Sequence, residues 1–85
     1  MPKLKPSQNE LIKINFVNVV LAKATLKGIS KRNVKTLAFS SYEVGNKRID
    51  HNPGAITLDD MINLSRVLKI PFEELMADAS RISRR

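Results

Sequence analysis

The side chains best suited to selective hydrogen bonding are crowded into one stretch of eight residues, 42–49. Tyr42, Glu43, Asn46 and Lys47 share one face if this stretch is a helix, because residues three and four apart are neighbours there. Together they offer a phenol, a carboxylate, a carboxamide and an ammonium, and so both donors and acceptors. The pattern predicts a surface for reversible polar recognition.

Several other kinds of chemistry are excluded or disfavoured by composition. The chain has no cysteine and a single histidine, His51, which argues against disulfides, thiolate metal sites and clustered imidazole ligands. It has no glycine-rich phosphate loop and no nucleophile–base pair. The acidic pairs Asp59–Asp60 and Glu73–Glu74 are interpreted as carboxylates at helix ends. We therefore expect no enzyme activity, no metal and no cofactor.

The charge of the chain is strongly positive and unevenly distributed. The formal net charge is +7, and the stretch from Lys23 to Arg48 holds seven basic residues against one acid, Glu43. Five of the eight acids lie at or beyond Asp59. This concentration indicates an anionic partner, of which nucleic acid is the usual one. The alternative is a generally solvated basic surface.

These side chains must be positioned by a single small domain of 85 residues. Residues 1–7 are predicted to be a flexible basic arm, residues 8–79 the folded domain, and residues 80–85 a basic tail. Ser7 and Glu10 have capping-box spacing, so a first helix is expected from Gln8 to Lys27, before Gly28. It carries two apolar stripes, Ile14, Val17, Leu21 and Ala24, and Ile12, Phe16, Val19 and Leu26. The second stripe meets either another helix of the chain or a partner subunit.

Two short helices are expected next. Ser30 caps the first, whose apolar stripe is Val34, Leu37 and Ala38. Ser41 caps the second, from Tyr42 to Ile49, with Val44, Gly45, Ile49 and the stem of Arg48 on the face opposite the polar one. A domain with such a helix is most simply interpreted as a helix-turn-helix DNA binder.

The remainder is also predicted to be helical. Asn52, Pro53 and Gly54 mark a loop, and Thr57 with Asp60 caps a helix that ends before Pro71. A last helix is expected over residues 71–80. No segment shows strand periodicity, so the fold class is all-α, a compact bundle of five helices. The expected core includes Val34, Ala38, Val44, Ile62 and Leu68. No membrane span or signal peptide is evident, and we expect a location in the cytoplasm.

The order of these elements, with the segments KGIS and NPGAITLDDMINLSRVLKIPFEELM, resembles the Xre/Cro-like helix-turn-helix family of phage and plasmid repressors. The resemblance covers roughly residues 10 to 77. Three positions depart from the family pattern. Lys35 stands where an alanine is usual, Phe39 where the turn glycine is usual, and Val44 and Ile49 are five residues apart instead of three or four.

The resemblance implies a lambda-repressor-like fold and a mechanism. The third helix would lie in the major groove and present Tyr42, Glu43, Asn46 and Lys47 to base edges. Asn46 is the leading candidate, because a carboxamide pairs bidentately with adenine. We expect Asn46 to be solvent-exposed, with Asn46→Ala leaving stability equal or slightly higher; alternatively, Gly45 and Asn46 mark an early helix end. DNA-backbone contacts are expected from Lys31, Arg32, Asn33, Ser41, Arg48, His51 and Asn52.

Three functional classes follow. The first is a transcriptional regulator of phage or mobile-element type that binds double-stranded DNA, as a homodimer at least on DNA. The second is a DNA-binding antitoxin with a toxin partner. The third is a protein–protein module that has lost DNA binding. The second stripe of the first helix and the C-terminal helix are the expected places for a dimer interface.

Overall fold

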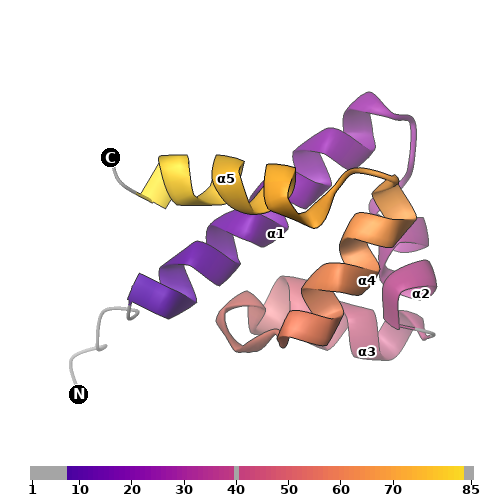
Figure 1. Cartoon of the computed structure of the whole chain (residues 1–85). Helices are drawn as coiled ribbons and strands as arrows, with labels where there is room; N and C mark the ends of the chain where they lie inside the picture. Colours follow the sequence, from indigo (N-terminus) through magenta and orange to yellow (C-terminus); the bar gives the residue numbers. More distant parts are fainter. Residues whose placement is uncertain (1–7, 40, 84–85) are drawn as a thin grey trace, which may run out of the picture.

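Five α-helices and two short helical turns form the part of the chain that the computed structural model describes, residues 8–39 and 41–83 (Figure 1). No strand occurs in these residues, so the expected all-α class is confirmed. The elements are α1 (Gln8–Leu26), α2 (Lys31–Phe39), α3 (Tyr42–Asn46), the π-helical turn η1 (Lys47–His51), the 3-10 turn η2 (Pro53–Ala55), α4 (Leu58–Leu68) and α5 (Phe72–Ser83).

The longest helix, α1, packs mainly against α5, which crosses it in Figure 1. Phe16 and Val19 of the second apolar stripe are buried, and the Phe16 ring lies 5.7 Å from that of Phe72. This part of the stripe therefore meets another helix of the same chain. Leu26, at the end of the stripe, is 86% exposed. Val20, which belongs to neither predicted stripe, is fully buried.

The ends of the helices follow the expected capping chemistry. Gly28 follows α1 with φ of +76°, and the Asn33 amide donates to Ser30 Oγ at 3.2 Å. Thr57 and Asp60 form a complete capping box at the start of α4. At its other end Lys69 takes the left-handed conformation, with φ of 57°, where glycine is more usual. These caps explain why the segments stop and start where they do.

The predicted core is partly right. Val34, Ala38 and Leu68 are buried as expected, and Ile62 is half-buried. Val44, by contrast, is 42% exposed and does not belong to the core. Leu37, assigned to the α2 stripe, is 66% exposed, while Lys35 is buried. In both cases the buried face of the helix is rotated from the predicted one, because α2 packs closely against α3.

Two predicted helix ends also change. The third helix keeps its α-form only to Asn46 and then continues as η1, where the Asn52 amide donates to the Lys47 carbonyl at 2.9 Å. The last helix extends to Ser83, three residues beyond the predicted end at Ser80. The arm at residues 1–7, the Ser7 half of the first capping box and the last two residues of the tail lie outside the described residues. No helix in the described ranges is long and apolar enough to cross a bilayer.

Candidate nucleic-acid interface

Helices α2 and α3 approach so closely that only glycine fits at position 45. A Cβ atom added to Gly45 would lie 2.6 Å from Lys35 Cβ and 2.8 Å from the Lys35 Cα and carbonyl oxygen. Real Cβ atoms are not found at such distances from backbone atoms, so the helices would have to separate. Gly45 therefore serves the contact between two helices of the chain itself, which the sequence did not reveal.

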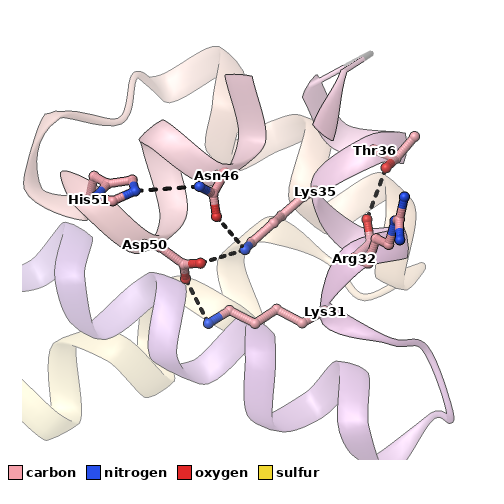
Figure 2. A network of polar contacts seen from close by, with 7 residues as sticks. All are labelled: Lys31, Arg32, Lys35, Thr36, Asn46, Asp50 and His51. Atoms are coloured by element: carbon pink, nitrogen blue, oxygen red, sulfur yellow. Dashed lines mark hydrogen bonds and ion pairs between the residues drawn. The ribbon is translucent and has the colours of Figure 1, made fainter. Parts of the chain in front are cut away.

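A buried lysine lies at the centre of this contact (Figure 2). Lys35 is only 4% exposed, and its Nζ donates to Asn46 Oδ1 at 2.9 Å and to Asp50 Oδ2 at 2.5 Å. Lys31 Nζ lies 2.6 Å from the other oxygen of Asp50. We call Lys31, Lys35, Asn46 and Asp50 the Lys35 cluster. Burial of an ammonium group is costly unless it is paired and hydrogen-bonded, and the cluster meets both conditions.

The electrostatics of the cluster favour ionised Asp50. Hydrogen bonds from Lys31 and Lys35 hold the pKa of the Asp50 carboxyl below its ordinary value of 3.8, and the partial burial of the group opposes this effect. Attraction to the two ammonium charges acts in the same direction as the hydrogen bonds. The carboxylate thus stays charged at neutral pH and ties η1 to α2.

Asn46 is not in the predicted position. It is half-buried in the Lys35 cluster, so the prediction that it is solvent-exposed is wrong. Its amide nitrogen lies 3.4 Å from Nε2 of His51, which accepts if the ring is neutral with its proton on Nδ1 (Figure 2). Because Asn46 satisfies buried Lys35, Asn46→Ala is now expected to lower stability. The alternative of an early helix end holds in part, since the α-form stops at Asn46.

Tyr42 lies beside the cluster and contacts cations through its ring. The Arg32 guanidinium carbon is 5.3 Å and Lys35 Nζ 5.2 Å from the ring centroid, within the range of cation–π attraction. Tyr42 remains 44% exposed. Of the residues predicted to contact bases, Tyr42 and Asn46 therefore have partners within the chain.

The other two predicted base-reading residues lie on what we call the outer face of α3, formed by Glu43, Val44 and Lys47. All three are exposed. Within the described ranges, no hydrogen bond or ion pair engages the side chain of Glu43 or Lys47. The register explains their position: Gly45 and Ile49, four residues apart, are buried, which turns Val44 outward with Glu43 and Lys47.

The residues predicted to contact the DNA backbone differ in their exposure and in their partners within the chain. Arg32, Asn33, His51 and Asn52 are exposed, whereas Ser41 is half-buried and its Oγ caps α3 by accepting from the Val44 amide at 3.2 Å. Lys31 and Arg48 are engaged in ion pairs, Lys31 with Asp50 and Arg48 with Asp60 at 2.9 Å. The Arg48 pair joins η1 to the first turn of α4. The structure therefore brings Lys31, Asn46 and His51 into one network and leaves Asn33 and Asn52 outside it.

Sequence reasoning did not predict the roles of these residues: it noted Lys35 only as a departure from the family pattern, placed Val44 in the core and gave Asp50 no role. A signal was present for Lys35, because the family that the chain resembles usually has an alanine, a small residue, at its position. A lysine there must bury its stem and find an acid within reach, and Asp50 is such an acid. No group of three or more metal-ligating side chains occurs in residues 8–39 and 41–83. Comparisons of this chain with protein-family models, curated proteins and solved structures find no match.

Proposed function

We propose that this chain is a sequence-specific, double-stranded DNA-binding regulator of transcription, of the lambda-repressor-like helix-turn-helix type, acting in the cytoplasm. One observation carries the proposal: a short helix, packed on α2 through Gly45, presents Glu43, Val44 and Lys47 without polar partners in the described structure. A carboxylate and an ammonium that have no hydrogen-bond or ion-pair partner among the described residues are available to base edges. The major groove is wide enough to admit such a helix.

The charges around this helix support an anionic partner. Arg32, Lys47 and Lys27 are exposed, and Lys31 keeps a half-exposed side chain in spite of its pair with Asp50. Lys35 is buried and contributes to structure instead of to the surface. Fewer than the seven basic side chains from Lys23 to Arg48 are therefore available to an anionic partner. Two that are exposed flank α3: Arg32 lies over the Tyr42 ring at its start, and Lys47 follows its end. Such residues position a protein on phosphates without reading sequence.

A homodimer on DNA is part of the proposal. One module of this size covers little DNA, and regulators of this kind commonly bind two half-sites about one helical turn apart. The expected operator is therefore an inverted repeat. Sedimentation of the protein with the selected duplex tests this directly, because two chains per duplex are expected and one chain would contradict it.

The decisive experiment is selection of bound duplexes from a random pool, followed by titration of the enriched sequence. We expect strong enrichment of one sequence. Arg32→Ala should weaken binding to operator and random duplex alike. It should also make the salt dependence shallower by about one unit in the log–log slope, because one phosphate fewer is neutralised. The control is Arg66→Ala, which removes the same charge from the exposed surface of α4 and should change neither affinity nor slope. A pool without enrichment would contradict the proposal.

A further inference from the structure

The exposed surface of α3 includes an apolar side chain that the fold does not explain. Val44 is 42% exposed, although it lies between buried Gly45 and the Ser41 cap. It is neither a member of the hydrophobic core nor among the partly buried apolar residues packed against that core. Its backbone amide takes part in the helix cap, but its two methyl groups add nothing to the core.

Helix stability gives no reason for this choice. Valine is a poorer helix former than alanine, glutamate or lysine, because its branched side chain loses rotamer freedom against the preceding turn. In a helix as short as α3, an exposed position would be filled better by any of those three. Isolated exposed apolar residues do occur on protein surfaces without a role, and the experiment below is designed to distinguish that case.

The neighbours of Val44 define what the outer face of α3 can recognise. Glu43 is an acceptor suited to the amino group of cytosine, and Lys47 is a donor suited to the acceptors of guanine. The major-groove edge of the base pairs carries one apolar group, the C5-methyl of thymine. An exposed pair of valine methyl groups beside an acceptor and a donor matches that group in size and polarity.

We propose that Val44 is a specificity-determining residue that reads the C5-methyl group of thymine in the major groove. This inference rests on the proposed function, and it replaces Asn46 with Val44 as the leading reader because the Asn46 side chain is held by buried Lys35. Recognition by Val44 requires no rearrangement of the Lys35 cluster. It selects thymine at one position of each half-site, and it does so by contact with a methyl group that uracil lacks.

The test uses the operator obtained by selection, with its thymines replaced one at a time by uracil. This change deletes only the methyl group and keeps every hydrogen-bonding atom. One apolar carbon removed from such a contact lowers affinity about three- to fivefold. We expect this reduction at one thymine of each half-site for the parent protein. For Val44→Ala, thymine and uracil operators should bind equally at that position.

A matched control is Leu58→Ala, since Leu58 is 57% exposed on α4 and its truncation likewise removes exposed apolar surface. It should retain the full discrimination between thymine and uracil. Val44→Thr, which keeps the branched shape and one methyl group, provides a second variant if Val44→Ala melts at a lower temperature. It should keep part of the discrimination.

The outcomes separate the inference from the proposed function. If an operator is enriched but uracil is tolerated at every position, or Val44→Ala keeps the discrimination, then Val44 does not read thymine and DNA binding stands. If no sequence is enriched, the proposed function fails and the role of Val44 fails with it.

Discussion

Asp50 and Asp78 each bind two cationic side chains, but the two regions around them are stabilised differently. Asp50 holds Lys31 and Lys35 between α2 and η1, and Lys35 is 4% exposed. Asp78 holds Lys23 and Arg81 at the contact of α1 with α5, where their side chains are 30% and 73% exposed. The α1–α5 contact rests on buried apolar side chains, and its ion pairs are peripheral. The contact of α2 with α3 and η1 depends instead on buried Lys35, which forms a hydrogen bond with Asn46 and an ion pair with Asp50.

This difference shows how a short helix can be fixed without a large apolar face. Helix α3 has five residues and contributes one buried residue, Gly45, with Ile49 following in η1. So small an apolar surface cannot hold a helix. The close approach at Gly45 and the hydrogen bonds of Lys35 replace it. If the comparison is right, substitutions in the two regions should change the free energy of unfolding by different amounts and with a different dependence on pH.

The largest effect is expected in the apolar region. Leu68 is 1% exposed, and Leu68→Ala should lower the free energy of unfolding by about 2–5 kcal/mol, because it removes apolar packing and leaves a cavity. Leu58→Ala is the control, since Leu58 is 57% exposed and its truncation should change stability by less than about 0.5 kcal/mol. Urea denaturation measures both. Equal changes in the two variants would mean that burial does not determine stability in this region.

A smaller effect, of unusual sign for a helix, is expected at Gly45. Glycine to alanine inside a helix normally stabilises by up to about 1 kcal/mol. Gly45→Ala should instead destabilise by about 1–3 kcal/mol, because the new Cβ meets the Lys35 backbone. Lys35→Ala should not relieve this destabilisation, since the Lys35 Cα and carbonyl remain in place. Gly54→Ala is the control: its new Cβ would lie 3.4 Å from the nearest atom, Glu10 Cβ, so this substitution should be tolerated. A stabilised Gly45→Ala protein would contradict the close approach of α2 and α3.

The smallest effects compare the two aspartates. Asp50→Asn should cost about 1 kcal/mol at pH 7, because buried Lys35 is deprived of its charged partner. Asp78→Asn should cost less than about 0.5 kcal/mol, because neither of its cationic partners is buried as Lys35 is. The folded-state pKa of Asp50 is lowered, so its contribution is complete above the ordinary value of 3.8 and is lost as the pH falls through the lower folded-state value.

Denaturation at pH 7 and at successively lower pH values measures this dependence. The difference between the parent protein and Asp50→Asn should shrink as the pH falls below 3.8. A difference that stays constant down to about pH 2 would show that the Asp50 charge does not stabilise the α2–α3 contact.

The fold was more predictable than the site. Caps at Ser30, Ser41 and Thr57 depend on local chemistry, which one sequence shows completely. Apolar periodicity likewise identified Val34, Ala38 and Leu68. It failed at Val44 because it assumes that the buried face is the most apolar one. Here the buried face of α3 begins with a glycine and meets a lysine, and neither residue is scored as apolar. The contacts of Lys35 with Asn46 and Asp50 join residues eleven and fifteen positions apart, which no local pattern reveals.

The separation of the outer face of α3 from the Lys35 cluster has a consequence for how this protein can change over generations. The side chains of Glu43 and Lys47 make no hydrogen bond or ion pair within the described residues, and Val44 does not pack on the core, so all three can be substituted at little cost in stability. Gly45, Asn46 and Asp50, their near neighbours in the chain, cannot. The outer face can therefore vary among related proteins, while the residues interleaved with it stay constant and keep the helix in place. Positions that can vary and positions that cannot therefore alternate between residues 43 and 50.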